Sequence, residues 1–141
     1  MQSVGNQSFI IESESKISEV SALILDALEH KLVLFIGDLG AGKTTIIKSM
    51  LEHLGSEDPG SSPSYSIINQ YKIADEIVHH IDLYRLNSAD EAFQLGFEEF
   101  IYNGSFCFIE WPQIVKEFID PPFNVITIEI LENNQRKIIL S

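Results

Sequence analysis

One stretch of the chain has residues of the types and spacing that bind a nucleoside triphosphate. It follows the pattern of Gly, four residues, Gly, Lys and Ser or Thr, and reads Gly37-Asp38-Leu39-Gly40-Ala41-Gly42-Lys43-Thr44. Glycines let backbone N–H groups approach phosphate oxygens directly, because no side chain stands in the way. Lys43 is placed to reach the outer phosphates, and the Thr44 hydroxyl is placed to ligate Mg²⁺. The stretch therefore predicts a phosphate-loop nucleotide site.

Two carboxylates are candidates for the acid that a phosphate-loop hydrolase needs at the end of a neighbouring strand. Glu110 follows an apolar run at 106–109 that is typical of a strand buried on both faces, and we favour it as the acid on the magnesium side. Asp82 follows the strand-like run 77–81 and could hold a water molecule or polarise the nucleophile. For each, the structural alternative is a solvated strand end. The sequence leaves open which acid positions the attacking water.

Several residues near these acids have both a functional and a structural interpretation. His79 and His80 are adjacent, so on a strand they point to opposite faces and cannot form a metal pair. Arg85 could contact phosphate or form a surface salt bridge, and Trp111 could lie beside the nucleotide or belong to the core. The segment Ser62-Pro63-Ser64-Tyr65 could close on Mg²⁺ or the γ-phosphate, or serve only as a connector.

The elements that position these residues alternate between strand and helix. Strands are expected at 8–12, 32–36, 67–73, 77–86, 106–109, 126–130 and 136–140, and helices at 17–28, 43–54, 88–96 and 97–102. Two of the strand pairs are expected to be antiparallel hairpins, which makes the sheet mixed. The pattern predicts an α/β sandwich like that of phosphate-loop NTPases, with a mixed, mainly parallel central sheet and a C-terminal β-hairpin. Ligands bind such sheets at the carboxyl ends of the strands.

Composition limits the class of protein. The 141 residues are expected to form one phosphate-loop domain, 1–141, with 21 acidic against 9 basic residues and a formal charge of −12. That charge repels nucleic acid and anionic membrane, so a tightly bound partner is expected to be a protein. No apolar run approaches the roughly 18 residues of a membrane span, and no basic leader is present, so the cytoplasm is expected. Cys107 is expected to pack in the core.

Taken together, four blocks of the chain resemble the TsaE family, also called YjeE, the small bacterial ATPases of tRNA threonylcarbamoyladenosine synthesis. In family order these blocks are the phosphate loop continued to Thr45, Ser62-Pro63-Ser64-Tyr65 with Tyr71 downstream, His80-Ile81-Asp82-Leu83-Tyr84-Arg85-Leu86, and Ile109-Glu110-Trp111-Pro112. Many families share the phosphate loop. The His-x-Asp-x-Tyr-Arg block followed by Glu-Trp-Pro is specific.

The resemblance implies a protein that binds and hydrolyses ATP with Mg²⁺ while docked on a TsaB–TsaD heterodimer, so that tRNA is reached only through the complex. It implies Mg²⁺ ligands at Thr44 and Glu110, a conserved switch acid at Asp82, an arginine near the nucleotide at Arg136, and contact with the base around Glu14 and Ser15. The expected nucleotide-binding residues are Asp38, Leu39, Gly40, Ala41, Gly42, Lys43, Thr44, Thr45, Ser15 and Arg136; the expected catalytic residues are Lys43, Asp82 and Glu110; and the expected switch residues are Ser62, Ser64, Tyr65, His80, Tyr84, Arg85 and Trp111.

The chain departs from the family pattern before Tyr65. Where the family commonly has Val-x-Ser-Pro-Thr, this chain has Gly60-Ser61-Ser62-Pro63-Ser64. Serine keeps the hydroxyl but loses the methyl group that limits its rotamers, and Gly60 loosens the backbone. We therefore expect a less populated closed state of this loop.

Two other functions stay open: a small-molecule kinase and a non-catalytic nucleotide sensor that regulates a partner enzyme. The kinase is less favoured because the chain has no Arg-rich lid. The chain also lacks the Asn-Lys-x-Asp pattern of guanine-selective GTPases, which favours adenine or relaxed base choice. No arginine finger is evident, so hydrolysis without partners is expected to be slow.

Overall fold

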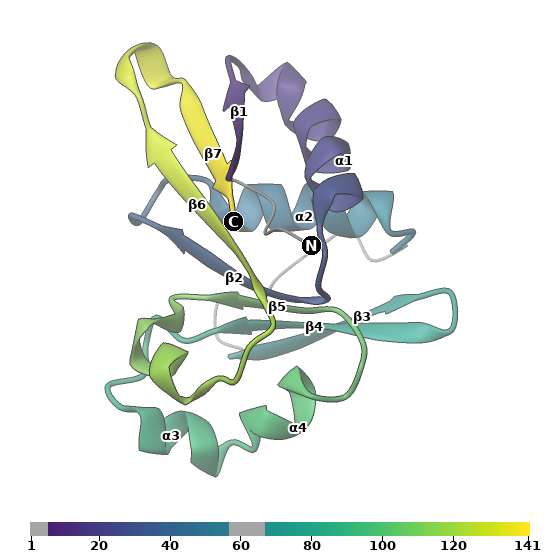
Figure 1. Cartoon of the computed structure of the whole chain (residues 1–141), viewed down its shortest axis with the longest axis vertical. Helices are drawn as coiled ribbons and strands as arrows, with labels where there is room; N and C mark the ends of the chain where they lie inside the picture. The colour runs from purple at the N-terminus through teal and green to yellow at the C-terminus, as the bar shows by residue number, and fades with distance from the viewer. Residues whose placement is uncertain (1–5, 57–66) are drawn as a thin grey trace.

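The computed structural model describes residues 6–56 and 67–141, which form one seven-stranded sheet with associated helices (Figure 1). The strands are β1 (Gln7–Ile11), β2 (Leu32–Gly37), β3 (Ile68–Ile73), β4 (Glu76–Asp82), β5 (Cys107–Glu110), β6 (Asn124–Ile130) and β7 (Arg136–Leu140). The α-helices are α1 (Ile17–Ala27), α2 (Lys43–His53), α3 (Ala89–Gln94) and α4 (Phe97–Ile101), and 3₁₀ turns lie at η1 (Glu14–Lys16), η2 (Pro112–Ile114), η3 (Lys116–Phe118) and η4 (Glu132–Asn134).

The strands lie in the order β1-β7-β6-β2-β5-β4-β3. The central strands β6, β2, β5 and β4 are parallel to one another. The outer pairings β1–β7, β6–β7 and β3–β4 are antiparallel. The expected mixed sheet and C-terminal hairpin are confirmed, but the parallel pairings are confined to the centre of the sheet. A single domain over 1–141 stays a prediction.

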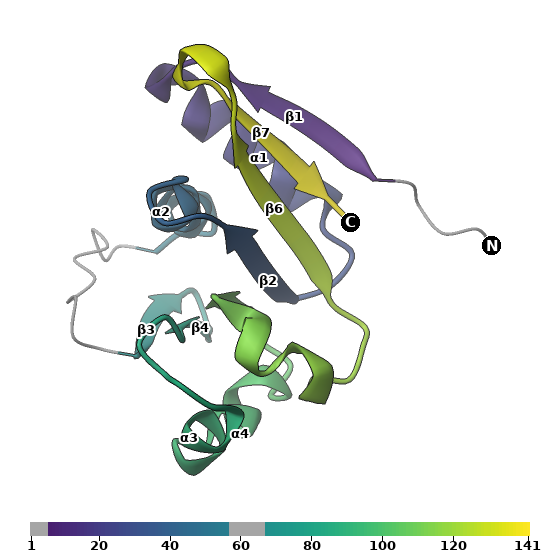
Figure 2. The ribbon, with the colours of Figure 1, turned by 90° about the vertical axis from the view of Figure 1, so that its left-hand side faces the viewer.

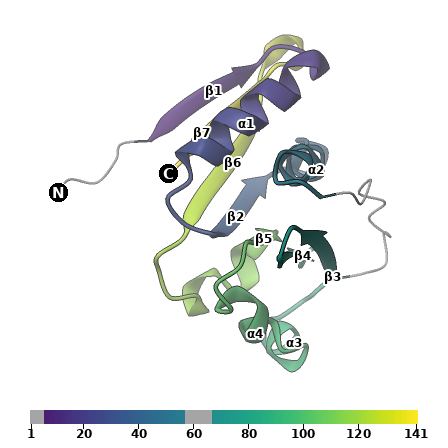
Figure 3. The same cartoon turned by 90° about the vertical axis from the view of Figure 1, so that its right-hand side faces the viewer.

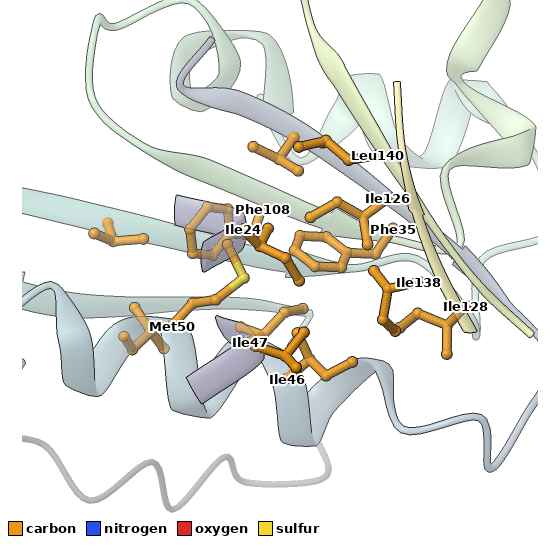
Figure 4. Close-up of a cluster of buried hydrophobic side chains, with 14 of the residues drawn as sticks. Ile24, Phe35, Ile46, Ile47, Met50, Phe108, Ile126, Ile128, Ile138 and Leu140 are labelled. Atoms are coloured by element: carbon orange, nitrogen blue, oxygen red, sulfur yellow. The ribbon is translucent and has the colours of Figure 1, made fainter. Parts of the chain in front are cut away.

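Apolar side chains pack on both faces of the sheet, because successive residues of a strand point to opposite sides. On one face, Val33 and Phe35 join a core that includes residues of α1 and α2. In Figure 4 the α2 side chains Ile46, Ile47 and Met50 lie against Phe35 and Phe108 of the sheet. On the other face, Leu32 and Leu34 join a core with α3, α4 and the segment after β5. Figures 2 and 3 show α3 and α4 well apart from α1.

Three parallel strands end together at one edge of the sheet. Phe35 of β2 pairs with Glu110 of β5, and Glu110 pairs in turn with Asp82 of β4. The last residues of β4 and β5 are therefore neighbours, beside the end of β2, where the phosphate-loop sequence begins. This places both candidate acids next to that loop, as the order of apolar runs in the sequence indicated.

The strand expected over 77–86 ends at Asp82 instead. Its carboxylate accepts a hydrogen bond from the backbone N–H of Tyr84 (3.0 Å), and the N–H of Leu86 bonds the carbonyl of Leu83 (3.0 Å), so the chain turns. Arg85, which the expected strand of 77–86 included, is therefore not part of β4. Arg85 lies on an exposed turn after β4.

The turn after β4 is followed by α3, where the sequence predicted a helix at 88–96. Ser88 caps α3 by accepting a hydrogen bond from the N–H of Glu91 (3.4 Å). The Glu91 carboxylate in turn accepts a hydrogen bond from the N–H of Asn87 (2.7 Å). Among the described residues, no helix is long and apolar enough to cross a bilayer. The segment Ser62-Pro63-Ser64-Tyr65, which was expected to close on Mg²⁺ or the γ-phosphate or to serve as a connector, lies outside the described residues.

Candidate functional site

The loop between β2 and α2 has a backbone that requires glycine at two positions. Gly40 and Gly42 have φ angles of 83° and 105°, in the left-handed region that other residues rarely adopt. The N–H of Ala41 donates to the carbonyl of Asp38 (2.9 Å), which closes the turn. The sequence spacing of glycines in this loop therefore has a conformational cause.

The loop ends at the first turn of α2, which starts at Lys43. The N-cap residue is Gly42, and no side chain among the described residues caps this end of the helix. The first N–H groups of a helix have no partner within the helix, and the helix dipole makes this end positive. An anion at this position would satisfy both the N–H groups and the dipole.

The Thr44 side chain contacts the acid at the end of β5. Its hydroxyl donates to both carboxylate oxygens of Glu110, at 3.1 Å to Oε1 and 3.0 Å to Oε2. Glu110 is buried, with 3% of its surface exposed. The sequence predicted these two residues as a pair, and the structure brings them together.

A second donor holds the same carboxylate from the neighbouring strand. The Nε2 atom of His80 lies 2.6 Å from Oε2 of Glu110, and both side chains are buried. His80 and Glu110 therefore share the face of the sheet that α2 covers. The adjacent His79 points to the other face, where its ring packs on Phe100 of α4 with centroids 4.6 Å apart. The expectation that the two histidines face opposite ways is confirmed.

The Lys43 ammonium group lies within the loop. It donates to the backbone carbonyls of Gly37 and Asp38 and sits 4.1 Å from the centre of the Trp111 ring. Burial lowers the pKa of Lys43 below its ordinary value, while the negative charges of Glu110, Asp82 and Asp38 act in the opposite direction. An anionic ligand would favour the charged form of this lysine further.

Trp111 has an unusual backbone for a bulky residue. Its φ and ψ are both 56°, in the left-handed region, and Pro112 begins a 3₁₀ turn immediately after it. Such a conformation costs of the order of 1 to 3 kcal/mol and persists where the surroundings enforce it. Here it turns the indole toward Lys43 and toward Tyr84, whose ring centre is 4.9 Å away. The two interpretations of Trp111 thus combine: the ring is partly buried and also lines the site.

Two cavities adjoin the loop. The smaller, of about 310 Å³, is lined by Leu39, Gly40, Gly42, Lys43, Thr44, Thr45, Asp82, Tyr84, Glu110 and Trp111. The larger, of about 440 Å³, is lined by Ile11, Glu12, Ser13, Glu14, Ile17, Gly40, Ala41, Gly42, Thr45, Ile46, Asn133, Asn134 and Arg136. Gly40, Gly42 and Thr45 line both, so the two cavities are neighbours that meet at the loop and the start of α2.

Arg136 joins the loop to the β6–β7 turn. Its Nε donates to the carbonyl of Ala41 (2.9 Å) and its Nη1 to the carbonyl of Asn134 (2.7 Å).

Ser15, expected near the base, lies on η1, where its hydroxyl is 2.9 Å from that of Ser13. Ser13 and Glu14 line the larger cavity, whereas a role for Ser15 stays a prediction.

Some lining residues of the larger cavity were not predicted. Asn133 and Asn134 lie between the two strands of the expected C-terminal hairpin, and both have positive φ angles in the β6–β7 turn. Glu12 and Ser13 follow β1 and carry no motif. The position of the outer strands decides this lining, and the order of strands across the sheet left no local signal in the sequence.

The donor atoms in the smaller cavity fit magnesium held jointly with a phosphate ligand. They are the oxygens of Thr44, Glu110 and Asp82, and Mg²⁺ prefers oxygen ligands, usually one or two carboxylates completed by water and phosphate. The described residues contain no cluster of three or more His, Cys, Asp or Glu side chains able to hold a metal alone.

Cys107 is buried, and burial raises the pKa of its thiol to about 12, so it is a core residue as expected.

The fold and the site define a class: an α/β protein with a glycine-containing loop, a lysine, and a threonine that contacts a buried carboxylate at the carboxyl edge of its sheet. A family model described as "Threonylcarbamoyl adenosine biosynthesis protein TsaE" matches residues 11–138. The chain belongs to the TsaE family, as the four sequence blocks indicated.

Individual relatives agree with this assignment. The tRNA threonylcarbamoyladenosine biosynthesis protein TsaE of Rickettsia felis is 36% identical over 129 residues, which cover 90% of this chain and 75% of that protein. The protein of the same name from Rickettsia prowazekii is 38% identical over 108 residues, covering 76% and 74%. A crystal structure of Bacillus subtilis YdiB superposes with a TM-score of 0.76 at 23% identity, covers 99% of this chain and 87% of that one, and shows the shared fold.

Proposed function

We propose that this chain is the ATP-binding and ATP-hydrolysing subunit needed for tRNA threonylcarbamoyladenosine modification, and that it acts on a TsaB–TsaD complex without transferring the group itself. The proposal rests chiefly on the contact of the Thr44 hydroxyl with both oxygens of Glu110, in the first turn of the helix that follows the glycine-containing loop. A hydroxyl and a carboxylate in this relation are what a phosphate-loop NTPase uses to hold Mg²⁺. Membership of the TsaE family supplies the process.

The two cavities divide the nucleotide between them in this proposal. The phosphates lie along the loop from Asp38 to Thr45, where backbone N–H groups and the Lys43 ammonium bind their oxygens. The nucleoside occupies the larger cavity, between the segment after β1 and the β6–β7 turn. Arg136 lines that cavity and fixes a carbonyl of the loop, so it orients the phosphate site from the nucleoside side.

Thr44 and Glu110 are the residues that hold magnesium in this proposal. When bound, Mg²⁺ neutralises charge that develops on the phosphate oxygens during transfer. Both oxygens of Glu110 already accept hydrogen bonds from Thr44 or His80. Asp82 lines the same cavity as Glu110, and its carboxylate accepts a hydrogen bond through Oδ1 from the N–H of Tyr84. We therefore assign the orientation of the attacking water to Asp82.

Turnover by the chain alone is expected to be slow. NTPases that turn over rapidly place an arginine finger on the transferred phosphate, and the described residues that line the smaller cavity include no arginine. Arg85 and the segment Ser62 to Tyr65 are proposed to respond to the γ-phosphate once the partners are bound. Because the chain carries a formal charge of −12, contact with tRNA is assigned to the partners. The cytoplasm stays the proposed compartment.

The test measures single-turnover ATP hydrolysis by the chain assembled with a TsaB–TsaD pair, for the wild type and for Lys43→Ala. We expect hydrolysis by the wild type and a loss of at least about a hundredfold in the variant, since the lysine contacts the transferred phosphate. Equal rates in the two would contradict the assigned site. ATP that binds but stays intact in the wild-type complex would instead identify a nucleotide sensor.

A further inference from the structure

A short hydrogen bond joins the side chains of His80 and Glu110, with Nε2 of the imidazole 2.6 Å from Oε2 of the carboxylate. Both side chains are almost fully buried, with exposed fractions of 3% and 4%. An ionised carboxylate only accepts hydrogen bonds, so Nε2 of His80 is the donor. Nδ1 of the same ring is buried and has no partner among the described residues. The ring is thus aimed at Glu110 and bonds nothing else in that part of the chain.

Three elements meet at the Glu110 carboxylate. β5 carries it, α2 supplies the Thr44 hydroxyl and β4 supplies the His80 imidazole. Thr44 shares one proton between the two carboxylate oxygens. This shared bond constrains the position of the carboxylate but leaves some freedom of rotation about its Cγ–Cδ bond. The second donor acts on Oε2 alone and from a different strand, which removes that freedom.

We propose that His80 is a positioning residue that fixes the rotamer of Glu110 so that the carboxylate meets Mg²⁺ beside Thr44. This inference rests on the proposed function. His80 lines neither of the two cavities next to the loop, so it is not assigned contact with the nucleotide. Mutation of a residue that hydrogen-bonds a metal ligand commonly lowers the affinity for the metal by about 10- to 100-fold.

The chain offers a matched control one residue away. His79 is as buried as His80, at 5% and 2% exposed, and lies on the same strand. Its ring faces Phe100 and the amide of Gln70 (3.2 Å) on the opposite face of the sheet from the loop. A leucine at either position removes a buried imidazole from β4, but only the change at His80 removes a donor to Glu110.

The experiment measures the dissociation constant of ADP by calorimetry, with Mg²⁺ and with EDTA, for the full chain and for His80→Leu, His80→Gln and His79→Leu. For each protein, the ratio of the dissociation constant in EDTA to that in Mg²⁺ is the gain in affinity due to magnesium. We expect His80→Leu to reduce this gain by about 10- to 100-fold. His80→Gln, whose amide nitrogen can replace Nε2, should restore most of it, and His79→Leu should keep the wild-type gain. A merely structural role would lower the melting temperature without changing the ratio.

The outcomes separate this inference from the proposed function. If the wild type binds ADP with no gain from Mg²⁺, the magnesium site itself is wrong. If the wild type shows the gain and His80→Leu retains it, only the positioning role is overturned. A measurement on the wild type needs no variant: nitrogen-detected NMR of the imidazole should show the proton of His80 on Nε2, and a proton on Nδ1 with Nε2 bare would overturn the inference.

Discussion

Replacing Thr44 with valine tests the central contact of the site. Valine has nearly the shape of threonine but has no hydroxyl, so packing around α2 changes little while the bond to Glu110 is lost. The hydroxyl proton is shared between two oxygens at 3.1 and 3.0 Å, so it counts as one hydrogen bond to a charged group. Such bonds contribute about 1.5 to 3 kcal/mol.

His80 still donates to Glu110 in the valine variant, so the carboxylate is not left without a partner. We therefore expect the free energy of unfolding to fall by about 2 kcal/mol in the absence of ligand. For a chain of 141 residues the entropy of unfolding is about 0.3 kcal/mol/K, so the melting temperature should fall by about 7 °C. Urea denaturation in EDTA measures the first quantity and calorimetry the second.

Thr45→Val is the matched control for stability. Thr45 is the next residue of the same helical turn and is exposed, so the same exchange should change the free energy of unfolding by less than about 0.5 kcal/mol. In ADP titrations, Thr44→Val should also lose at least about tenfold of the gain in affinity from Mg²⁺. If Thr44→Val unfolds with the same free energy as the wild type and keeps the magnesium gain, the reasoning about this contact is refuted.

Three further predictions concern other parts of the molecule. Asn124→Ala should lower the free energy of unfolding by about 2 to 4 kcal/mol in urea, because the buried amide accepts two backbone N–H bonds from the turn before β2 (2.9 and 2.8 Å) and donates to the carbonyl of Ser141 (3.0 Å); a change below 1 kcal/mol would contradict this. The emission of Trp111, the only tryptophan, should change in proportion to bound ADP because the Lys43 ammonium over its ring moves to phosphate, and a titration with no change in emission would argue against the loop as the phosphate site. Burial lowers the pKa of His79, so the unfolded chain binds more protons and stability should decrease as the pH falls below about 6.5, by at most about 1.4 kcal/mol per pH unit. His79→Phe should flatten this decrease, and an unchanged pH profile would count against it.

Much of the site was predictable because its residues lie at the ends of apolar runs. A glycine-containing loop after one run and an acid after another give the edge of the sheet where they meet, provided that the strands are parallel. Glu110 was favoured on this basis, and it is the acid that contacts Thr44. The spacing of the loop glycines indicated the loop itself, and the positive φ angles of Gly40 and Gly42 give a conformational reason for glycine at these two positions.

Contacts between distant strands were not predictable in this way. The bond from Arg136 to the loop depends on where β7 lies in the sheet. The family resemblance implied that this arginine lies near the nucleotide, but it did not indicate the hydrogen bond to the carbonyl of Ala41. The left-handed backbone of Trp111 has no signal either, because positive φ is expected of glycine or asparagine. The strand expected to reach residue 86 was too long, since β-rich composition continued past the point where the Asp82 carboxylate bonded the following backbone.

The register of β4 connects the fold to the chemistry of the site. β4 is held on both sides, by β5 in parallel and by β3 in antiparallel pairing, with His80 opposite Phe108 and Asn69. A slip of one residue would exchange the two faces: His79 would point toward Glu110, and Ile81 would leave its apolar core for the polar edge. The loss of that core contact opposes the slip. The apolar residues that alternate with the histidines therefore determine which histidine reaches the carboxylate.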